Sequence, residues 1–395
     1  MTYDVTELRS HFPSLDSGTA HFDSPAGTQT PRQVGAAIAA TLTGPLSNRG
    51  TGSPSESNAD AAVAAFRSAY ADLLGVPAGG IVYGRSATQL IYDFSRAIAK
   101  DWRSGDVIVV SRLDHDSNVR PWVQAAEQQG VTVHWLDFDP ETGELEEAQL
   151  DPRTRLVAIT GASNLIGTKP PVRRIADAAH AVGAQVFVDA VHLAAHGFVD
   201  VTELGADYFV CSPYKFLGPH CGVLGAAPEL LATLRNDKLV PSTDAVPERF
   251  ELGTLPYEIM AGATATVDFL AAIAPGDATS RRERLRTSLH AVDEHELRLR
   301  TRLEDGLDPG VVVHSRAADR TPTLLLTFPG RETKDAYRFL AERGVLAPAG
   351  SFYAYEGFRR LGLEDENALR LGLAPYVDDT DVDRALEGLA AFLDR

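Results

Sequence analysis

The feature of this sequence that most limits its fold is a regular alternation between residues 81 and 212. Short runs rich in Val and Ile alternate there with amphipathic segments of helical spacing. The runs are IVY (81–83), DVIVVS (106–111), VTVHWLD (131–137), RLVAIT (155–160), AQVFVDA (184–190) and DYFVCS (207–212). Apolar runs without polar alternation indicate strands buried on both faces, and the helices between them favour parallel connections. The sequence therefore predicts an α/β fold with a mostly parallel sheet.

The pattern changes near residue 255, so we expect a second domain of α+β type. A chain of 395 residues is also too long for one ordinary core. We predict an N-terminal segment (1–30) that packs with the small domain, a large α/β domain (31–254) and a small α+β domain (255–395). The charged helix expected at 279–306 is interpreted as a solvated face with ion pairs. The stretch TGPLSNRGTGSPSESN (43–58) is expected to be a loop.

Composition narrows the possible partners and the compartment. The formal net charge of -17 repels nucleic acids and anionic membranes, which leaves a small molecule as the expected partner. The N-terminus lacks a signal pattern, and no apolar run approaches the roughly 20 residues that span a bilayer, so we expect a cytoplasmic protein. The two cysteines, Cys211 and Cys221, match neither a metal-ligand spacing nor a disulfide framework, so no metal is predicted.

Polar residues follow several of the predicted strands. Asp189 closes the strand QVFVD, and Lys215 follows the next strand after a short turn. His115 and Asn164 follow two other strands, and the turn GRSAT (84–88) opens a helix. Each has an ordinary structural explanation, such as a helix cap, a turn former or a surface lysine. Because ligands bind beyond the carboxyl ends of parallel strands, we instead expect these residues to share one site.

An amine, a carboxylate and an anion cradle at one sheet edge suit the chemistry of pyridoxal 5'-phosphate. A lysine forms a Schiff base with the aldehyde of this cofactor, and a carboxylate keeps its pyridine nitrogen protonated so that the ring accepts electrons. A helix N-terminus binds the phosphate. The sequence therefore predicts a pyridoxal phosphate site.

The same residues lie in motifs that resemble a known family. From FDSPAGTQTP (22–31) to LRLGLAPYVDDTDVDRAL (369–386), the chain resembles the class V aminotransferases of pyridoxal phosphate fold type I, in particular the cysteine desulfurase-like proteins. The resemblance implies a large domain with a mostly parallel seven-stranded sheet. It also implies that Lys215 in CSPYK carries the internal aldimine, that Asp189 contacts the pyridine nitrogen and that His115 stacks on the ring. His192 and Asn164 match the residues near the ring 3'-oxygen.

The resemblance also implies how the phosphate and the substrate are bound. Ala87 and Thr88 in SATQ match the phosphate turn, and Ser212 matches a serine that precedes the lysine. Thr254 in RFELGT matches the residue that reaches the phosphate of a neighbouring subunit, which implies a homodimer. Arg370 matches the arginine that binds the substrate carboxylate.

Two departures from the family pattern bear on the reaction. Tyr214 replaces the usual histidine beside the lysine, in a position that contacts the cofactor. The loop APAGSFYAYEGFRRLG (347–362) has no cysteine where desulfurases carry their nucleophile, and its Tyr353 is expected to shape the substrate pocket. We therefore expect an enzyme that acts on an amino acid and is cysteine desulfurase-like or C–S lyase-like. The alternatives are an aminotransferase, an epimerase or an oxygen-using decarboxylating enzyme on the same scaffold and, more distantly, a non-catalytic cofactor-binding protein.

Overall fold

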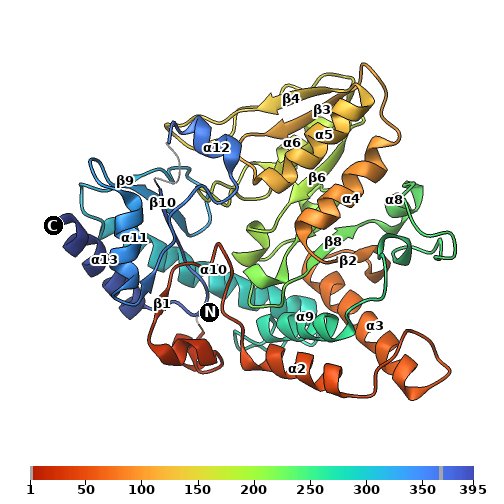
Figure 1. Ribbon diagram of the computed structural model, residues 1–395, viewed down its shortest axis with the longest axis horizontal. Coiled ribbons are helices and arrows are strands. Elements are labelled where there is room, and N and C mark those ends of the chain that lie inside the picture. Colours follow the sequence, from red (N-terminus) through yellow and green to blue (C-terminus); the bar gives the residue numbers. More distant parts are fainter. Residues whose placement is uncertain (1–2, 364–367) are drawn as a thin grey trace.

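A seven-stranded sheet forms the centre of the computed structural model, which describes residues 3–363 and 368–395 (Figure 1). Its strand order is β2-β8-β7-β6-β5-β3-β4, and β8 alone runs in the opposite direction to the other six strands. The strands are β2 (Ile81–Gly84), β3 (Val107–Ser111), β4 (Thr132–Leu136), β5 (Thr154–Thr160), β6 (Gln185–Asp189), β7 (Tyr208–Cys211) and β8 (Gly222–Ala226). Six of them correspond to the six apolar runs, so the predicted α/β fold is confirmed.

Helices cover both faces of this sheet (Figure 1). Helices α3 (Pro54–Leu74), α4 (Ala87–Ala99), α5 (Arg120–Gln129) and α6 (Val172–Ala181) contact its strands directly. Helix α9 (Tyr257–Leu270) packs on α3, and α2 (Arg32–Thr43) packs on α9. The short helices α7 (Val201–Leu204) and α8 (Pro228–Thr233) follow β6 and β8 in the chain. Successive residues of one strand enter different cores: Val186 and Val188 of β6 belong to one buried cluster, whereas Phe187 belongs to the other. Because both faces are covered, the three central positions of the strand are all apolar, which explains the runs seen in the sequence.

The C-terminal part contains a three-stranded antiparallel sheet of order β12-β10-β9. Its elements are α10 (Arg281–Asp305), β9 (Val312–Val313), β10 (Thr323–Thr327), α11 (Thr333–Ala341), β11 (Val345–Leu346), α12 (Tyr355–Arg360), β12 (Leu369–Gly372) and α13 (Asp379–Leu393). Near the N-terminus, α1 (Val5–Arg9) precedes β1 (Ala20–His21), which pairs in parallel with β11. This pairing supports the proposed packing of the N-terminal segment (1–30) with the small domain.

The expected loop at 43–58 is only partly a loop, because α3 already begins at Pro54. The Ser53 side chain accepts a hydrogen bond from the Glu56 backbone N–H, and the Glu56 side chain binds the Ser53 backbone in return. Proline at the first helical position requires no hydrogen bond from its nitrogen. The Ser and Pro that suggested a loop are therefore the start signal of a helix.

The charged helix α10 is not purely a solvated face. Arg298 and Arg302 pair with Asp379 on α13, as the ion-pair interpretation predicts. One side of α10 is nevertheless buried. Its Glu296 is 0% exposed, and Glu296 Oε2 lies 2.8 Å from His196 Nδ1. Across residues 3–363 and 368–395, no helix combines the length and the apolar character needed to cross a bilayer.

Candidate active site

A cavity of about 700 Å³ opens at the carboxyl ends of the parallel strands, and residues of both the proposed large domain and the proposed small domain line it. Every site residue predicted from the sequence lies on its wall except Thr254. The residues that it brings together are Ala87, Thr88, His115, Asn164, Asp189, His192, Ser212, Tyr214, Lys215, Tyr353 and Arg370. Thr254 is exposed in the segment after η6 (Glu248–Phe250), away from the cavity of its own chain.

Lys215 enters the cavity from the turn η5 (Pro213–Lys215), directly after β7. Its Nζ donates hydrogen bonds to the carbonyl oxygens of Pro25 and Ala26, the latter at 3.2 Å. Burial, together with the charge of Arg370, lowers the Lys215 pKa to about 7. An amine with this pKa is partly neutral at physiological pH, which suits a nucleophile or a base.

Asp189 is the last residue of β6, and its buried carboxylate faces the same cavity. Its Oδ1 accepts a hydrogen bond from the backbone N–H of Val191 at 3.0 Å. Burial raises the Asp189 pKa to about 6, and the nearby Lys215 charge opposes that rise. A cation bound against Asp189 would stabilise the carboxylate form. This environment suits the protonated pyridine nitrogen that the resemblance predicts at this position.

His115 begins the short turn η3 (Asp116–Asn118) after β3. Its Nδ1 accepts a hydrogen bond from the backbone N–H of Ser117 at 3.1 Å, so the ring proton is on Nε2. Burial lowers the His115 pKa to about 4, with contributions from Lys215 and Arg370. The imidazole is therefore neutral near pH 7, and a neutral ring is suited to stack on an aromatic cofactor.

The first turn of α4 offers an anion cradle. The Ser86 Oγ caps the helix by accepting from the Gln89 N–H at 3.1 Å, and Ser86, Ala87 and Thr88 line the cavity. Backbone N–H groups at a helix N-terminus lack intrahelical acceptors and favour anions. β8 passes closely behind this turn because Gly222 has no side chain: a Cβ there would lie 2.4 Å from the Ser86 carbonyl carbon.

Arg370 on β12 brings a buried cation from the small domain. Its Nη1 donates to the Asn164 carbonyl oxygen at 2.6 Å, and it is only 2% exposed. Burial lowers its pKa to about 9, which leaves it charged at neutral pH. Arg370 Nε and Asn164 Oδ1 are buried without a hydrogen-bond partner among the described residues. Unpaired buried polar groups on a cavity wall indicate that a ligand satisfies them.

Two predicted cofactor contacts have other partners in the structure. His192 Nε2 lies 3.0 Å from Thr321 Oγ1 and 2.9 Å from Thr323 Oγ1, so the small domain engages one of its two ring nitrogens. Tyr214 stacks on His220 with ring centroids 4.7 Å apart, and Lys215 Nζ lies 4.9 Å from the Tyr214 ring centroid. Their contacts with the cofactor stay predictions.

The sequence interpretation missed several residues of the cavity wall. They are Pro25, Ala26, Tyr92, Asp116, Ser117, Arg120, Pro121, Gln124, Thr160, Ala162, Val191 and Phe352. Arg120 and Gln124 stand one helical turn apart at the start of α5, a spacing that the sequence displays. Pro25 and Ala26 lie in FDSPAGTQTP, where the family resemblance begins, but no local pattern places them at the cavity. Their segment reaches it through long-range contacts such as the hydrogen bond from Thr28 N–H to the Tyr214 carbonyl oxygen.

These residues fit pyridoxal phosphate. The cavity joins an amine of lowered pKa, a buried carboxylate, a neutral imidazole and a helix N-terminus, and it contains two unpaired polar atoms. Lys215 would hold the aldehyde carbon, Asp189 the ring nitrogen, and the first turn of α4 the phosphate. The donor set matches the cofactor group by group.

Comparisons with known proteins agree with this chemistry. The model of the family "Aminotransferase class-V" matches residues 20–385. An uncharacterised protein of Mycobacterium tuberculosis is 31% identical over 399 residues, which cover 99% of this chain and 100% of the relative. A probable cysteine desulfurase of Pseudomonas aeruginosa is 31% identical over 95% of each chain. The crystal structure of the cysteine desulfurase CsdA of Escherichia coli superimposes with a TM-score of 0.86 at 26% identity, covering 100% of this chain and 99% of the other.

The match extends from the N-terminal segment beside Lys215 to the last helix, so it includes both walls of the cavity. The chain therefore belongs to the class V aminotransferase family and is a pyridoxal phosphate-dependent enzyme with the α/β fold of cysteine desulfurases.

Proposed function

We propose that the protein acts on an α-amino acid as a C–S lyase-like enzyme that uses no protein thiol. The observation that carries this proposal is the content of the cavity: Lys215 and Arg370 line it, whereas neither cysteine does. The guanidinium of Arg370 can bind the carboxylate common to all α-amino acids, and the cofactor aldehyde that Lys215 would hold can condense with their amino group.

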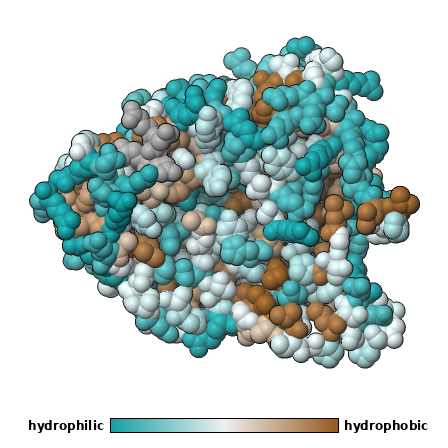
Figure 2. Space-filling model, viewed as in Figure 1, coloured by the Kyte–Doolittle hydropathy of each residue, from teal (hydrophilic) through white to brown (hydrophobic). Residues whose placement is uncertain are grey.

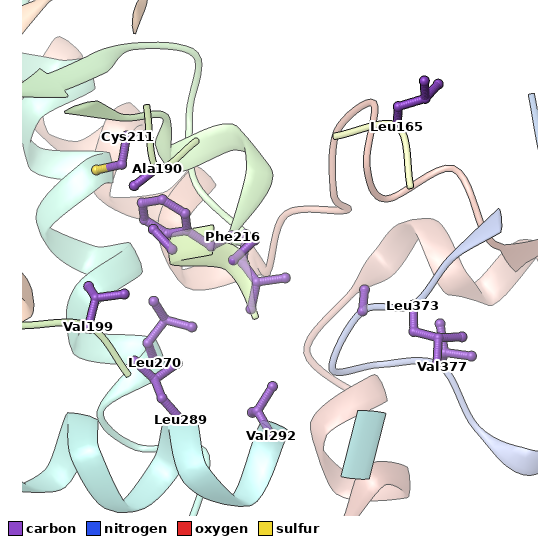
Figure 3. Packing of buried hydrophobic residues seen from close by; sticks show 14 of the residues in the cluster. Leu165, Ala190, Val199, Cys211, Phe216, Leu270, Leu289, Val292, Leu373 and Val377 are labelled. Carbon is purple, nitrogen blue, oxygen red and sulfur yellow. The ribbon is translucent and has the colours of Figure 1, made fainter. Parts of the chain in front are cut away.

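The two cysteines are poorly suited to carry a persulfide. Cys211 is 0% and Cys221 is 1% exposed, and burial raises the pKa of both thiols far above the ordinary range. Figure 3 shows Cys211 among apolar side chains of the buried cluster, with Ala190 and Phe216. A thiol that neither ionises nor reaches the substrate is inert.

Pyridoxal phosphate, when bound, supplies an aldehyde that condenses with amino groups and a ring that takes up the electrons of a bond broken at the α-carbon. Arg370 binds the substrate carboxylate through its unpaired edge and so orients the α-carbon. Lys215, whose pKa is about 7, accepts the α-proton at Nζ and returns it later. His115 covers one face of the site as a neutral ring and excludes water from it.

The direct test is a product screen with purified holoenzyme. With S-methylcysteine and water, a C–S lyase releases methanethiol, pyruvate and ammonia in equal amounts. Formation of these three products that is lost in Lys215→Ala would support the proposal. A keto acid that retains the sulfur would instead indicate an aminotransferase, and carbon dioxide would indicate a decarboxylating enzyme.

A cysteine-free variant separates this route from a desulfurase. We expect Cys211→Ala/Cys221→Ala to retain most of its turnover, after correction for stability, because both side chains belong to the core. Mass spectrometry during turnover with cysteine should detect no sulfur added to either residue. Addition of one sulfur atom to Cys221, together with loss of activity in the variant, would restore the desulfurase interpretation.

We further propose a homodimer in which Thr254 completes the site of the partner subunit. Several large apolar residues are exposed: Leu42 at 61%, Leu239 at 68%, Val240 at 97% and Leu252 at 49%. Figure 2 shows apolar atoms gathered over α2 and at the loop after α8. Exposed apolar groups of this size favour burial in a subunit interface.

A further inference from the structure

The turn before α12 holds two aromatic residues in an unusual backbone conformation. Phe352 has φ 55° and Tyr353 has φ 56°, both in the left-handed region that side chains other than glycine rarely adopt. Two consecutive residues in this region persist only where surrounding contacts compensate for the strain. Both residues line the cavity, so the unusual conformation belongs to the site.

The large domain holds the backbone of this turn at two points. The Phe352 carbonyl oxygen accepts a hydrogen bond from Asn164 Nδ2 at 2.8 Å. The Tyr353 carbonyl oxygen accepts one from the Asp116 backbone N–H at 2.7 Å. The two donors come from different loops at the sheet edge, and together they fix the orientation of both peptide groups.

A carboxylate on α12 adds a third attachment, which we name the Glu356 latch. Glu356 Oε2 lies 2.9 Å from Arg112 Nη1, and Glu356 Oε1 contacts Arg120 Nη2. The Glu356 side chain is only 13% exposed, so water screens these pairs less than it screens a surface pair. The latch therefore ties the helix that follows the turn to the large domain.

The two aromatic rings lie on the residues that would handle the substrate. The Arg370 guanidinium carbon lies 3.8 Å from the Phe352 ring centroid. The Tyr353 ring stacks on His115 with centroids 5.5 Å apart and planes 26° apart. Because Phe352 contacts Arg370 and both rings line the cavity, they lie within reach of the side chain of a substrate whose carboxylate is bound by Arg370.

The charged groups around the Glu356 latch are already paired with one another. The ion pairs are Arg112 with Asp137 and Glu356, Arg120 with Asp116 and Glu356, and Arg360 with Asp137. Three cations match three carboxylates in this set, so its net charge is zero. A charged substrate side chain would lose its hydration here without gaining an unpaired partner from this set.

We propose that Phe352 and Tyr353, fixed by the Glu356 latch, form a rigid aromatic wall that selects amino acids with uncharged apolar side chains, thioethers included. This inference rests on the proposed function only in taking an α-amino acid as the substrate. Aromatic rings bind apolar groups and divalent sulfur, and a wall that is already ordered loses little entropy on binding.

The test is a binding series that compares side chains on a constant backbone. Alanine, S-methylcysteine, phenylalanine and aspartate are titrated into the holoenzyme, and binding is followed by the change in cofactor absorbance. We expect phenylalanine and S-methylcysteine to bind at least about fivefold more tightly than alanine, and aspartate to bind more weakly than alanine. Because all four probes use Arg370 equally, the ratio to alanine isolates the contact with the wall.

Substitutions then assign the preference to the turn. Phe352→Ala should reduce the ratio of phenylalanine to alanine affinity by about tenfold, whereas Phe352→Leu, which keeps an apolar contact, should preserve most of it. Glu356→Gln should lower the ratio severalfold and speed hydrogen exchange at the amides of 351–356. Glu387→Gln, at an exposed position on α13, is the matched control and should change neither.

The outcomes distinguish the two proposals. A wild-type cofactor spectrum that responds to none of the four probes would refute the proposed function. A spectrum that responds, with a preference that survives in folded Phe352→Ala, would refute the aromatic wall and leave the proposed function intact. Tighter binding of aspartate than of phenylalanine would refute the selection for uncharged side chains.

Discussion

Burial determines the protonation of the residues around the cavity. It lowers the pKa of Lys215 to about 7 and that of His115 to about 4, and it raises that of Asp189 to about 6. For the amine and the imidazole the neutral form is favoured, because a low-dielectric environment disfavours charge. At neutral pH the site therefore contains a partly neutral lysine beside a neutral ring and a largely ionised carboxylate.

The lowered pKa of Lys215 predicts how cofactor attachment depends on pH. Only the neutral amine attacks an aldehyde, so the rate at which the cofactor-free protein takes up pyridoxal phosphate should rise about tenfold per pH unit below 7 and level off above it. Stopped-flow absorbance between pH 5 and 9 measures this profile. In Arg370→Gln the midpoint should move to higher pH, because the Arg370 charge helps to lower the Lys215 pKa. A midpoint near 10 in the wild type would contradict the lowered pKa.

Asp189 should matter for turnover more than for cofactor binding. Asp189→Asn keeps the size of the side chain and an oxygen that accepts the hydrogen bond from Val191 N–H. It removes the negative charge that would keep the pyridine nitrogen of the cofactor protonated. We expect the cofactor to stay bound and kcat to fall by about 10²-fold or more, the range found when one electrostatic group is removed from an active site. Unchanged turnover per bound cofactor would reassign Asp189 to a structural role.

The elements that build the site depend on close contact between strand and helix. β8 lies against the first turn of α4 only because Gly222 lacks a side chain, and an added Cβ would also lie 2.6 Å from the Ala87 nitrogen. The anion cradle thus depends on a residue that does not itself line the cavity. Because β8 runs antiparallel to β2 and β7, its first residue, Gly222, lies at the sheet edge where α4 begins.

Gly222→Ala should therefore weaken cofactor binding. Its methyl group would push the start of α4 away from β8, and we expect the dissociation constant of pyridoxal phosphate to rise about tenfold or more, measured by equilibrium dialysis. Gly35→Ala is the control, because a Cβ at this position on α2 meets no atom within 4 Å. Equal affinity in folded Gly222→Ala would show that the cradle tolerates displacement.

At the scale of the whole molecule, the cavity exists because three parts of the chain meet. Lys215 and Asp189 lie in the proposed large domain, Arg370 and Phe352 in the proposed small domain, and Pro25 and Ala26 in the N-terminal segment, and all six line the cavity. The Glu356 latch and the His192 contacts with β10 join the domains on two sides. Movement between the domains would therefore alter the substrate site directly.

The proposed homodimer predicts complementation between inactive chains. Lys215→Ala lacks the amine, and a Thr254→Val chain would impair the site of its partner. In a mixed dimer both defects fall on one site, and the other site is complete. After purification of the heterodimer by differential tags, activity per dimer should therefore recover to about a quarter to a half of the wild-type value. Verified heterodimers without activity would indicate self-contained subunits.

The sequence alone determined the fold and the chemical identity of the site residues. Apolar runs such as QVFVD require burial on both faces, and the polar residue that ends each run must lie at the carboxyl edge of a parallel sheet, as Asp189 does. These are local patterns combined with one rule of topology. That is why Lys215, His115, Asn164 and Asp189 were predicted for one site, and all four line one cavity. Arg370 was predicted only from the family resemblance, and it lines the same cavity.

Only the tertiary structure decided those features that depend on contacts between distant segments of the chain. The cap at Ser53 makes Pro54 the start of α3 and not part of a loop. On α10, Glu296 is buried, because amphipathic spacing alone does not reveal which charged residues a neighbouring segment will cover. The left-handed turn at Phe352 depends on hydrogen bonds from Asn164 and Asp116. A backbone conformation stabilised by distant partners leaves no pattern in its own residues, so only the folded chain reveals it.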